Sequence, residues 1–127
     1  MNKAILLEHL LTSIKEKLDT VQDAINLVQQ SANQETKSTA GDKYETARAM
    51  AQNERDILMR QLLQIKSDYA VLQQLDIRQK SDRVTPGCLV VTSFGTLFLS
   101  VSVGLMTVDG EKVMVVSPAS PVGKAIM

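Results

Sequence analysis

The strongest constraint in this sequence is a repeat of mostly apolar residues that is mirrored about Ser38. On the N-terminal side, spacings of three and four residues alternate through Val28, Ile25, Val21, Leu18, Ile14, Leu11 and Leu7. On the C-terminal side, the same spacings run through Arg48, Ala51, Arg55, Leu58, Leu62, Ile65 and Tyr69. This rhythm is typical of a helix that packs along its length against another helix. The mirror therefore predicts a long antiparallel helical hairpin, a coiled coil in which Leu18 faces Leu58.

The two predicted helices flank a polar turn. The first is expected from about Lys3 to about Ser31 and the second from about Asp42 to about Leu75. Between them, Ser31–Gly41 consists of small and polar residues, the composition of a turn. Asp42 and Glu45 have the spacing of a capping box, which satisfies free backbone amides where a helix starts.

The mirrored repeat weakens toward this turn. Arg48 and Arg55 occupy two of its positions, whereas the positions from Leu58 onward are apolar. We therefore expect the stability of the hairpin to concentrate at the end far from the turn. There, Leu6 and Leu10 widen the apolar stripe, which predicts that the first helix also packs on a second neighbour.

Beyond the charged stretch Asp76–Arg83, the apolar period changes from that of a helix to that of a strand. Strands are expected over four segments: Cys88–Thr92, Thr96–Val103, Leu105–Val108 and Lys112–Ser117. Asp109-Gly110 is a tight-hairpin signal between the last two. The predicted class is α+β: a hairpin domain over residues 1–78 and a small antiparallel β domain over 79–127. A core this small is marginal alone, so we expect it to pack on Leu6, Leu10, Leu72 and Leu75.

Composition excludes several classes of protein. The 14 basic and 14 acidic residues balance, so no net field draws the chain onto nucleic acid or an anionic membrane. Aromatic residues make up 3%, too few for base-stacking platforms. Val84–Val108 carries no charge, which raises a membrane-spanning alternative, but prolines and glycines interrupt it and its apolar residues alternate. Met1–Leu11 is interrupted by charge and lacks a cleavage site, so no signal peptide is expected.

The single cysteine and the single histidine are both expected to be structural. Cys88 has no partner for an internal disulfide, which favours a reducing, cytoplasmic compartment and a buried, inert thiol. His9 has no second histidine or cysteine near it, so we expect an exposed surface residue rather than a metal ligand. No catalytic set, metal-spaced cluster or phosphate loop is present, and no intrinsic enzyme activity is predicted. The remaining candidates are three acids near the turn: Glu35, Asp42 and Glu45, of a type that suits Mg²⁺.

Two segments resemble the Gre family of bacterial transcript-cleavage factors. The tail Val115-Val-Ser-Pro-Ala-Ser-Pro-Val-Gly-Lys-Ala-Ile126 is similar to the C-terminal Ser-Pro-(Ile/Val)-(Gly/Ala)-(Lys/Arg)-Ala-Leu segment of that family. Tyr44-Glu-Thr-Ala-Arg48 is similar to the Tyr-x-Ala-Ala-Lys/Arg that opens the family's second helix. Aligned without gaps on Tyr44, the family's two metal-binding acids fall on Lys37 and Ala40. A gapped alignment places them on Asp42 and Glu45.

The resemblance implies a partial FKBP-like C-terminal domain that docks on RNA polymerase while the hairpin enters the secondary channel. It implies that Asp42 and Glu45 help to bind a Mg²⁺ ion in the polymerase's own active site, with no cofactor bound to the chain alone. Contacts with the partner are then expected at the matched residues: Tyr44, Arg48, Ser117, Pro118, Ser120, Pro121, Gly123 and Lys124.

Two functions from different classes remain open on the sequence. One is a Gre-like regulator of transcription elongation, with or without stimulated cleavage. The other is a non-catalytic interaction protein that forms a homodimer through its hairpin. The wide apolar stripe that contains Leu6, Leu10, Leu27 and Ile57 favours it. Neither function involves a membrane or sequence-specific binding of nucleic acid.

Overall fold

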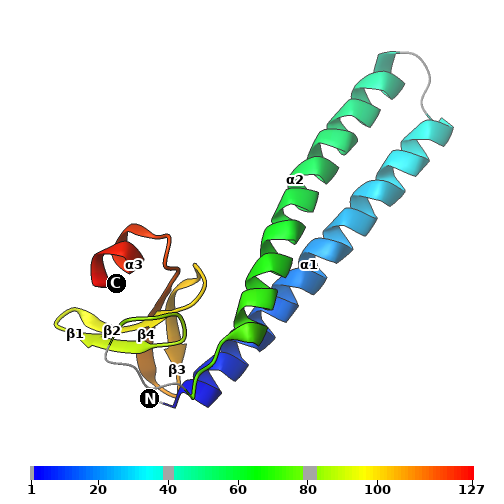
Figure 1. Cartoon of the computed structure of the whole chain (residues 1–127). Coiled ribbons are helices and arrows are strands. Elements are labelled where there is room, and N and C mark those ends of the chain that lie inside the picture. Colours follow the sequence, from blue (N-terminus) through cyan, green and yellow to red (C-terminus); the bar gives the residue numbers. More distant parts are fainter. Residues whose placement is uncertain (1, 39–41, 79–82) are drawn as a thin grey trace. The chain divides into compact units, whose positions relative to one another are not determined.

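The computed structural model describes residues 2–38, 42–78 and 83–127, with side chains described outside 32–44 (Figure 1). The chain has an α+β fold, in which two long helices precede a small mixed sheet. The helices are α1 (Lys3–Ser38), α2 (Asp42–Gln74) and a short α3 (Pro121–Ile126). The strands are β1 (Leu89–Thr92), β2 (Gly95–Leu99), β3 (Gly104–Val108) and β4 (Glu111–Val116).

Helix α1 is longer than the sequence predicts. It starts at the expected residue, where the Asn2 side-chain oxygen accepts a hydrogen bond from the Ala4 amide at 2.9 Å. It then continues to Ser38, so the turn predicted from Ser31 onward is wrong over residues 31–38. This stretch is polar but contains good helix formers such as Gln34 and Glu35, and no glycine or proline. The predicted fold-back lies at residues 39–41, outside the described part of the chain.

The chain divides into two compact units. One, the helical unit, comprises Ile14–Ser67, and the other, the sheet unit, comprises Met1–Ser13 with Asp68–Met127. In the helical unit, burial follows the mirrored repeat: Ile14, Ile25 and Leu62 are no more than 5% exposed. Arg48 and Arg55, which interrupt the repeat, are exposed. The predicted domain boundary at residues 78 and 79 adjoins positions outside the described residues.

The sheet has the order β1-β2-β4-β3, and this order corrects the predicted antiparallel module. Strands β1 and β2 are antiparallel, as are β3 and β4, but β2 and β4 run parallel. The cause is an early end to β2, at Leu99 instead of the predicted Val103. The Ser100 amide donates to the Val116 carbonyl at 2.8 Å and the Val103 amide to the Val115 carbonyl at 3.3 Å. The chain therefore crosses the end of β4, and β3 begins on the other side of β4.

The hairpin between β3 and β4 is confirmed. Val108 pairs with Glu111, which leaves Asp109 and Gly110 as a two-residue loop. Their φ angles are 51° and 81°, both in the left-handed region that this type of turn requires. Asparagine, aspartate and glycine tolerate that region best, so Asp-Gly fixes the register of β3 on β4.

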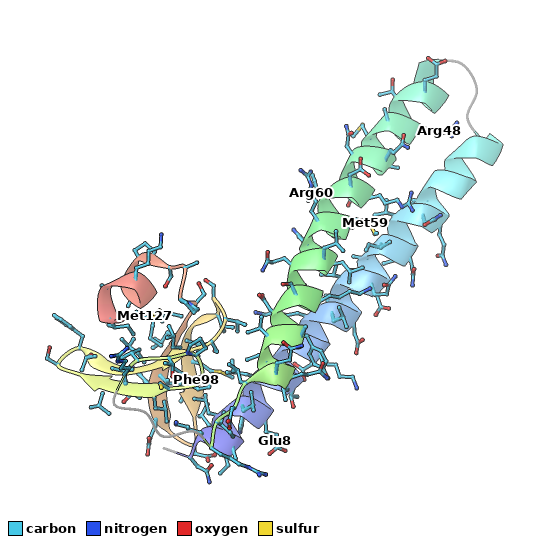
Figure 2. All side chains as sticks on the ribbon, viewed as in Figure 1. Glu8, Arg48, Met59, Arg60, Phe98 and Met127 are labelled. Carbon is cyan, nitrogen blue, oxygen red and sulfur yellow. The ribbon has the colours of Figure 1, made fainter. Side chains whose placement is uncertain are left out.

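One face of the sheet forms the core of its unit. Phe98, Val113 and Val115 have no exposed surface, and Phe98 is seen among closely packed side chains in Figure 2. In the same unit, three leucines from the helices are also fully buried: Leu6, Leu10 and Leu72. The start of α1 lies against the β3–β4 hairpin, where Asn2 and Ile5 line a small cavity with Val108, Asp109 and Glu111. Of the four leucines predicted to pack against the strands, Leu6, Leu10 and Leu72 are thus buried in the unit that contains the strands, whereas Leu75 is partly buried.

The segment predicted as a membrane alternative folds into the sheet instead. Val84–Val108 supplies β1, β2 and β3. Within the described ranges, neither long helix has a stretch long and apolar enough to cross a bilayer.

Candidate functional site

The tail motif forms a tight, capped turn that starts α3. The Ser120 hydroxyl donates a hydrogen bond to the Ser117 carbonyl at 2.7 Å and accepts one from the Gly123 amide at 3.0 Å. Ser120 is therefore the N-cap of α3, and Pro121 follows it in the first turn. A proline is tolerated there because a backbone amide at that position would have no acceptor within the helix. The Ser120 amide also donates to the Ser117 carbonyl, at 3.1 Å. One hydroxyl and one carbonyl thus hold the end of β4 and the start of α3 together.

Steric constraints in this turn require glycine at position 123. A Cβ atom built at this position would overlap with the backbone carbonyl of Ser117 and lie 3.0 Å from the Ser120 hydroxyl oxygen. The conflict is with backbone atoms, which cannot rotate away as a side chain can. Ser120, Pro121 and Gly123 of the motif therefore each have a structural role in the turn, and Ser117 contributes its backbone carbonyl; sequence reasoning assigned all four only to partner binding.

The motif is partly exposed. Ser117, Pro118 and Ser120 are partly buried and Gly123 is buried, whereas Pro121 and Lys124 are exposed. A partner that contacts the tail could reach these two residues and the exposed side chains beside them: Ala119, Val122 and Ala125.

The predicted acids near the turn are only partly described. Asp42 is the first residue of α2, but its side chain, like those of Glu35 and Tyr44, lies outside the described side chains. The predicted capping box and metal pair therefore remain predictions. Glu45 and Arg48 are described, exposed, and three residues apart on α2, so they share a face of the helix (Figure 2 labels Arg48).

Cys88 is partly exposed rather than buried as predicted. The Thr85 hydroxyl lies 3.3 Å from the Cys88 sulfur, and the Thr85 amide donates to that sulfur at 3.4 Å. Burial raises the pKa of the Cys88 thiol, but the two Thr85 contacts and the charge of Lys3 outweigh it, so the pKa lies below its ordinary value. The thiol lies directly before β1, and its described hydrogen-bond partners, Thr85 and the Arg83 carbonyl, do not form a catalytic pair with it.

The described side chains contain no cluster of three or more histidines, cysteines or acids that would hold a metal ion. His9 is exposed on α1, as predicted.

A groove on the second face of the sheet was missed by the sequence reasoning. It has a volume of about 760 Å³, and α3 forms one wall while side chains from β2, β3 and β4 form the floor. The available signal was the second set of alternating residues, Leu97, Leu105 and Met114, which the register places in one row. Comparisons with models of known protein families, with curated proteins and with solved structures find no match to this chain.

Proposed function

We propose that this chain is a Gre-like regulator of transcription elongation that binds bacterial RNA polymerase at its secondary channel. The observation that carries the proposal is the order of elements. Two helices of 36 and 33 residues with a short connection precede a small sheet that ends in a capped Ser-Pro-x-Ser-Pro-x-Gly-Lys-Ala turn. A helix of this length extends about 50 Å at 1.5 Å per residue, long enough to act as a probe.

The proposed probe is an antiparallel coiled coil of α1 and α2. The burial of Ile14, Ile25 and Leu62 at positions of the mirrored repeat supports this pairing. The exposure of Arg48 and Arg55 supports a thinner, more polar end toward the connection. A narrow polar end suits a water-filled channel, because it exposes little apolar surface there.

The acids near the connection would act on the partner's metal rather than on a metal of their own. Asp42 and Glu45, with Glu35 close in sequence, are hard oxygen ligands of the type that Mg²⁺ prefers alongside water. In the polymerase they would share a Mg²⁺ ion with the enzyme's active site and orient the attacking water. The sheet unit, proposed to be partly FKBP-like, would dock outside the channel, with Tyr44 and Arg48 inside it.

Binding to core bacterial RNA polymerase tests this proposal, with Asp42→Asn/Glu45→Gln as the informative variant. We expect the wild type to bind and to alter the release of stalled elongation complexes. The double variant should bind with similar affinity and lose the effect on stalled complexes. Asp19→Asn, an exposed acid of α1, is the matched control and should behave as wild type. If the wild-type chain does not bind the polymerase, the proposal is wrong.

The second candidate is a homodimeric interaction protein, favoured by large apolar side chains that the helical unit leaves exposed. Leu27, Met50, Ile57 and Leu63 are each at least half exposed. Burial of such side chains against a second copy would be favourable. Sedimentation equilibrium distinguishes the two candidates. The second function is supported if the wild-type chain is a dimer that does not bind polymerase and if the double variant Ile57→Lys/Leu63→Lys is a monomer.

A further inference from the structure

The sheet of this protein has a second apolar face, opposite the one that carries Phe98. The register aligns Leu97 of β2 with Met114 of β4, and Met114 with Leu105 of β3. These three side chains form a row across three strands. Val122 and Ile126 of α3 line the same space, so the row is the floor of a groove and α3 is its wall. Figure 1 shows the ribbon of α3 beside the sheet.

This groove has the size and lining of a site for a small organic molecule. Its volume of about 760 Å³ lies within the roughly 300 to 1,000 Å³ of ligand pockets. Water reaches its apolar side chains, since Leu105 is 63% exposed, Val122 45% and Met114 39%. Covering these surfaces with an apolar ligand would release that water, which is the main favourable contribution to binding at such a site.

One positive charge marks the groove. Of the thirteen described residues that line it, Lys112 alone is charged. Lys112 and Met114 are two residues apart on β4, so both point to the groove face of the sheet. On β1, the Thr92 hydroxyl is already engaged, because it donates to the Gly95 carbonyl at 2.8 Å and accepts from the Phe94 amide at 3.2 Å. Lys112 is therefore the polar group best placed to orient a ligand.

We propose that the groove binds an amphipathic carboxylate, with its aliphatic chain on Leu97, Leu105 and Met114 and its carboxylate paired with Lys112. A small anion fits this arrangement better than a second copy of the chain. A two-fold contact of groove against groove would give neither Lys112 an acidic partner, because the thirteen lining residues include no aspartate or glutamate. The proposal is independent of the function proposed above, since it involves only the sheet unit.

Titration of the full chain with octanoate and decanoate, below their micelle concentrations, tests the site by calorimetry and by amide chemical shifts. Each buried methylene should raise the affinity about fourfold, so decanoate should bind about fifteenfold more tightly than octanoate. Decanol, which has no charge, should bind less tightly than decanoate. The amide shifts should concentrate at β2, β4 and α3.

Two variants separate the apolar and charged contributions. Leu105→Gln, at an exposed position, should weaken decanoate strongly without unfolding the sheet. Lys112→Gln should weaken decanoate about two- to fivefold and leave decanol unchanged. Lys66→Gln, on α2 in the helical unit, is the matched control and should leave both ligands unaffected. Equal affinity for decanol and decanoate, no response to Leu105→Gln, or a dimer that forms through the groove and excludes decanoate would overturn the proposal.

Discussion

Gly123→Ala should destabilise the sheet unit, although alanine is the better helix former. In an ordinary helix this exchange stabilises by up to about 1 kcal/mol. Here the added Cβ would overlap with the Ser117 carbonyl and press on the Ser120 hydroxyl. To make room, α3 must move away from the end of β4, which breaks the hydrogen bond from the Gly123 amide to Ser120.

The size of the effect follows from these contacts. Loss of the N-cap costs about 1 kcal/mol, and overpacking against backbone costs about 1 to 3 kcal/mol. After subtraction of the gain in helix propensity, we expect a net loss of about 1 to 3 kcal/mol. Ser120→Ala removes the cap without the overlap, so it should cost about 1 kcal/mol. Because both exchanges break the same hydrogen bond, the double variant should cost less than the sum of the two.

Amide hydrogen exchange provides a local assay for this prediction. The Lys124 amide donates to the Ser120 carbonyl at 2.9 Å and the Met127 amide to the Gly123 carbonyl at 3.2 Å. Both amides should lose protection in Gly123→Ala, together with a lower urea midpoint for the sheet unit. Lys124→Ala, an exposed position on the same helix, should change stability by no more than about 0.5 kcal/mol. If Gly123→Ala is as stable as wild type, the predicted overlap between the added Cβ and the Ser117 carbonyl is wrong.

Three further predictions follow from the other contacts. Phe98→Ala should cost about 3 to 5 kcal/mol in urea unfolding, whereas Phe94→Ala, at a fully exposed phenylalanine, should leave the urea midpoint unchanged; equal losses would contradict the assigned core. Asn2→Ala should cost about 1 kcal/mol and speed hydrogen exchange at the first turn of α1; unchanged exchange would rule out the cap. The rate of Cys88 alkylation should titrate below the ordinary thiol pKa, and Thr85→Val should raise that pKa. Folding lowers this pKa. The free energy of unfolding should therefore rise with pH between the thiol pKa of the folded state and that of the unfolded state, and this contribution should be lost as the pH falls through the folded-state pKa.

The helical part of the fold was largely predictable because helix burial depends on local spacing. Most positions of the mirrored repeat are half-buried and Arg48 and Arg55 are exposed, while Ile14, Ile25 and Leu62 are the buried repeat positions. The polar stretch after Ser31 was misjudged because its composition is typical of a turn. It also contains good helix formers such as Gln34 and Glu35, and a helix already begun adds a residue more easily than a new one starts.

The individual strands were predictable, but the order in which they pair in the sheet was not. Alternation of side chains predicted four strands, and Asp109-Gly110 predicted which two form a hairpin. Alternation continues from Leu99 to Val103 even though the strand ends, because Val101 is buried as the chain crosses β4. Pairing between β2 and β4 depends on that crossing, which joins residues distant in sequence and leaves no local signal.

The tail motif of the candidate site shows that a residue pattern can arise from local structure rather than from binding. The tail motif was interpreted as a surface that binds a partner, yet Ser120, Pro121 and Gly123 have local causes in the cap of α3. Any chain that makes this turn after a strand would favour these residue types at the same spacing. The tail therefore argues for a local turn more than for a partner. Within the order of elements that carries the polymerase proposal, the helical pair and the acids near its connection, Asp42 and Glu45, are thus the parts that bear on the partner. Variants of those acids, with binding and release of stalled complexes measured separately, address the partner directly.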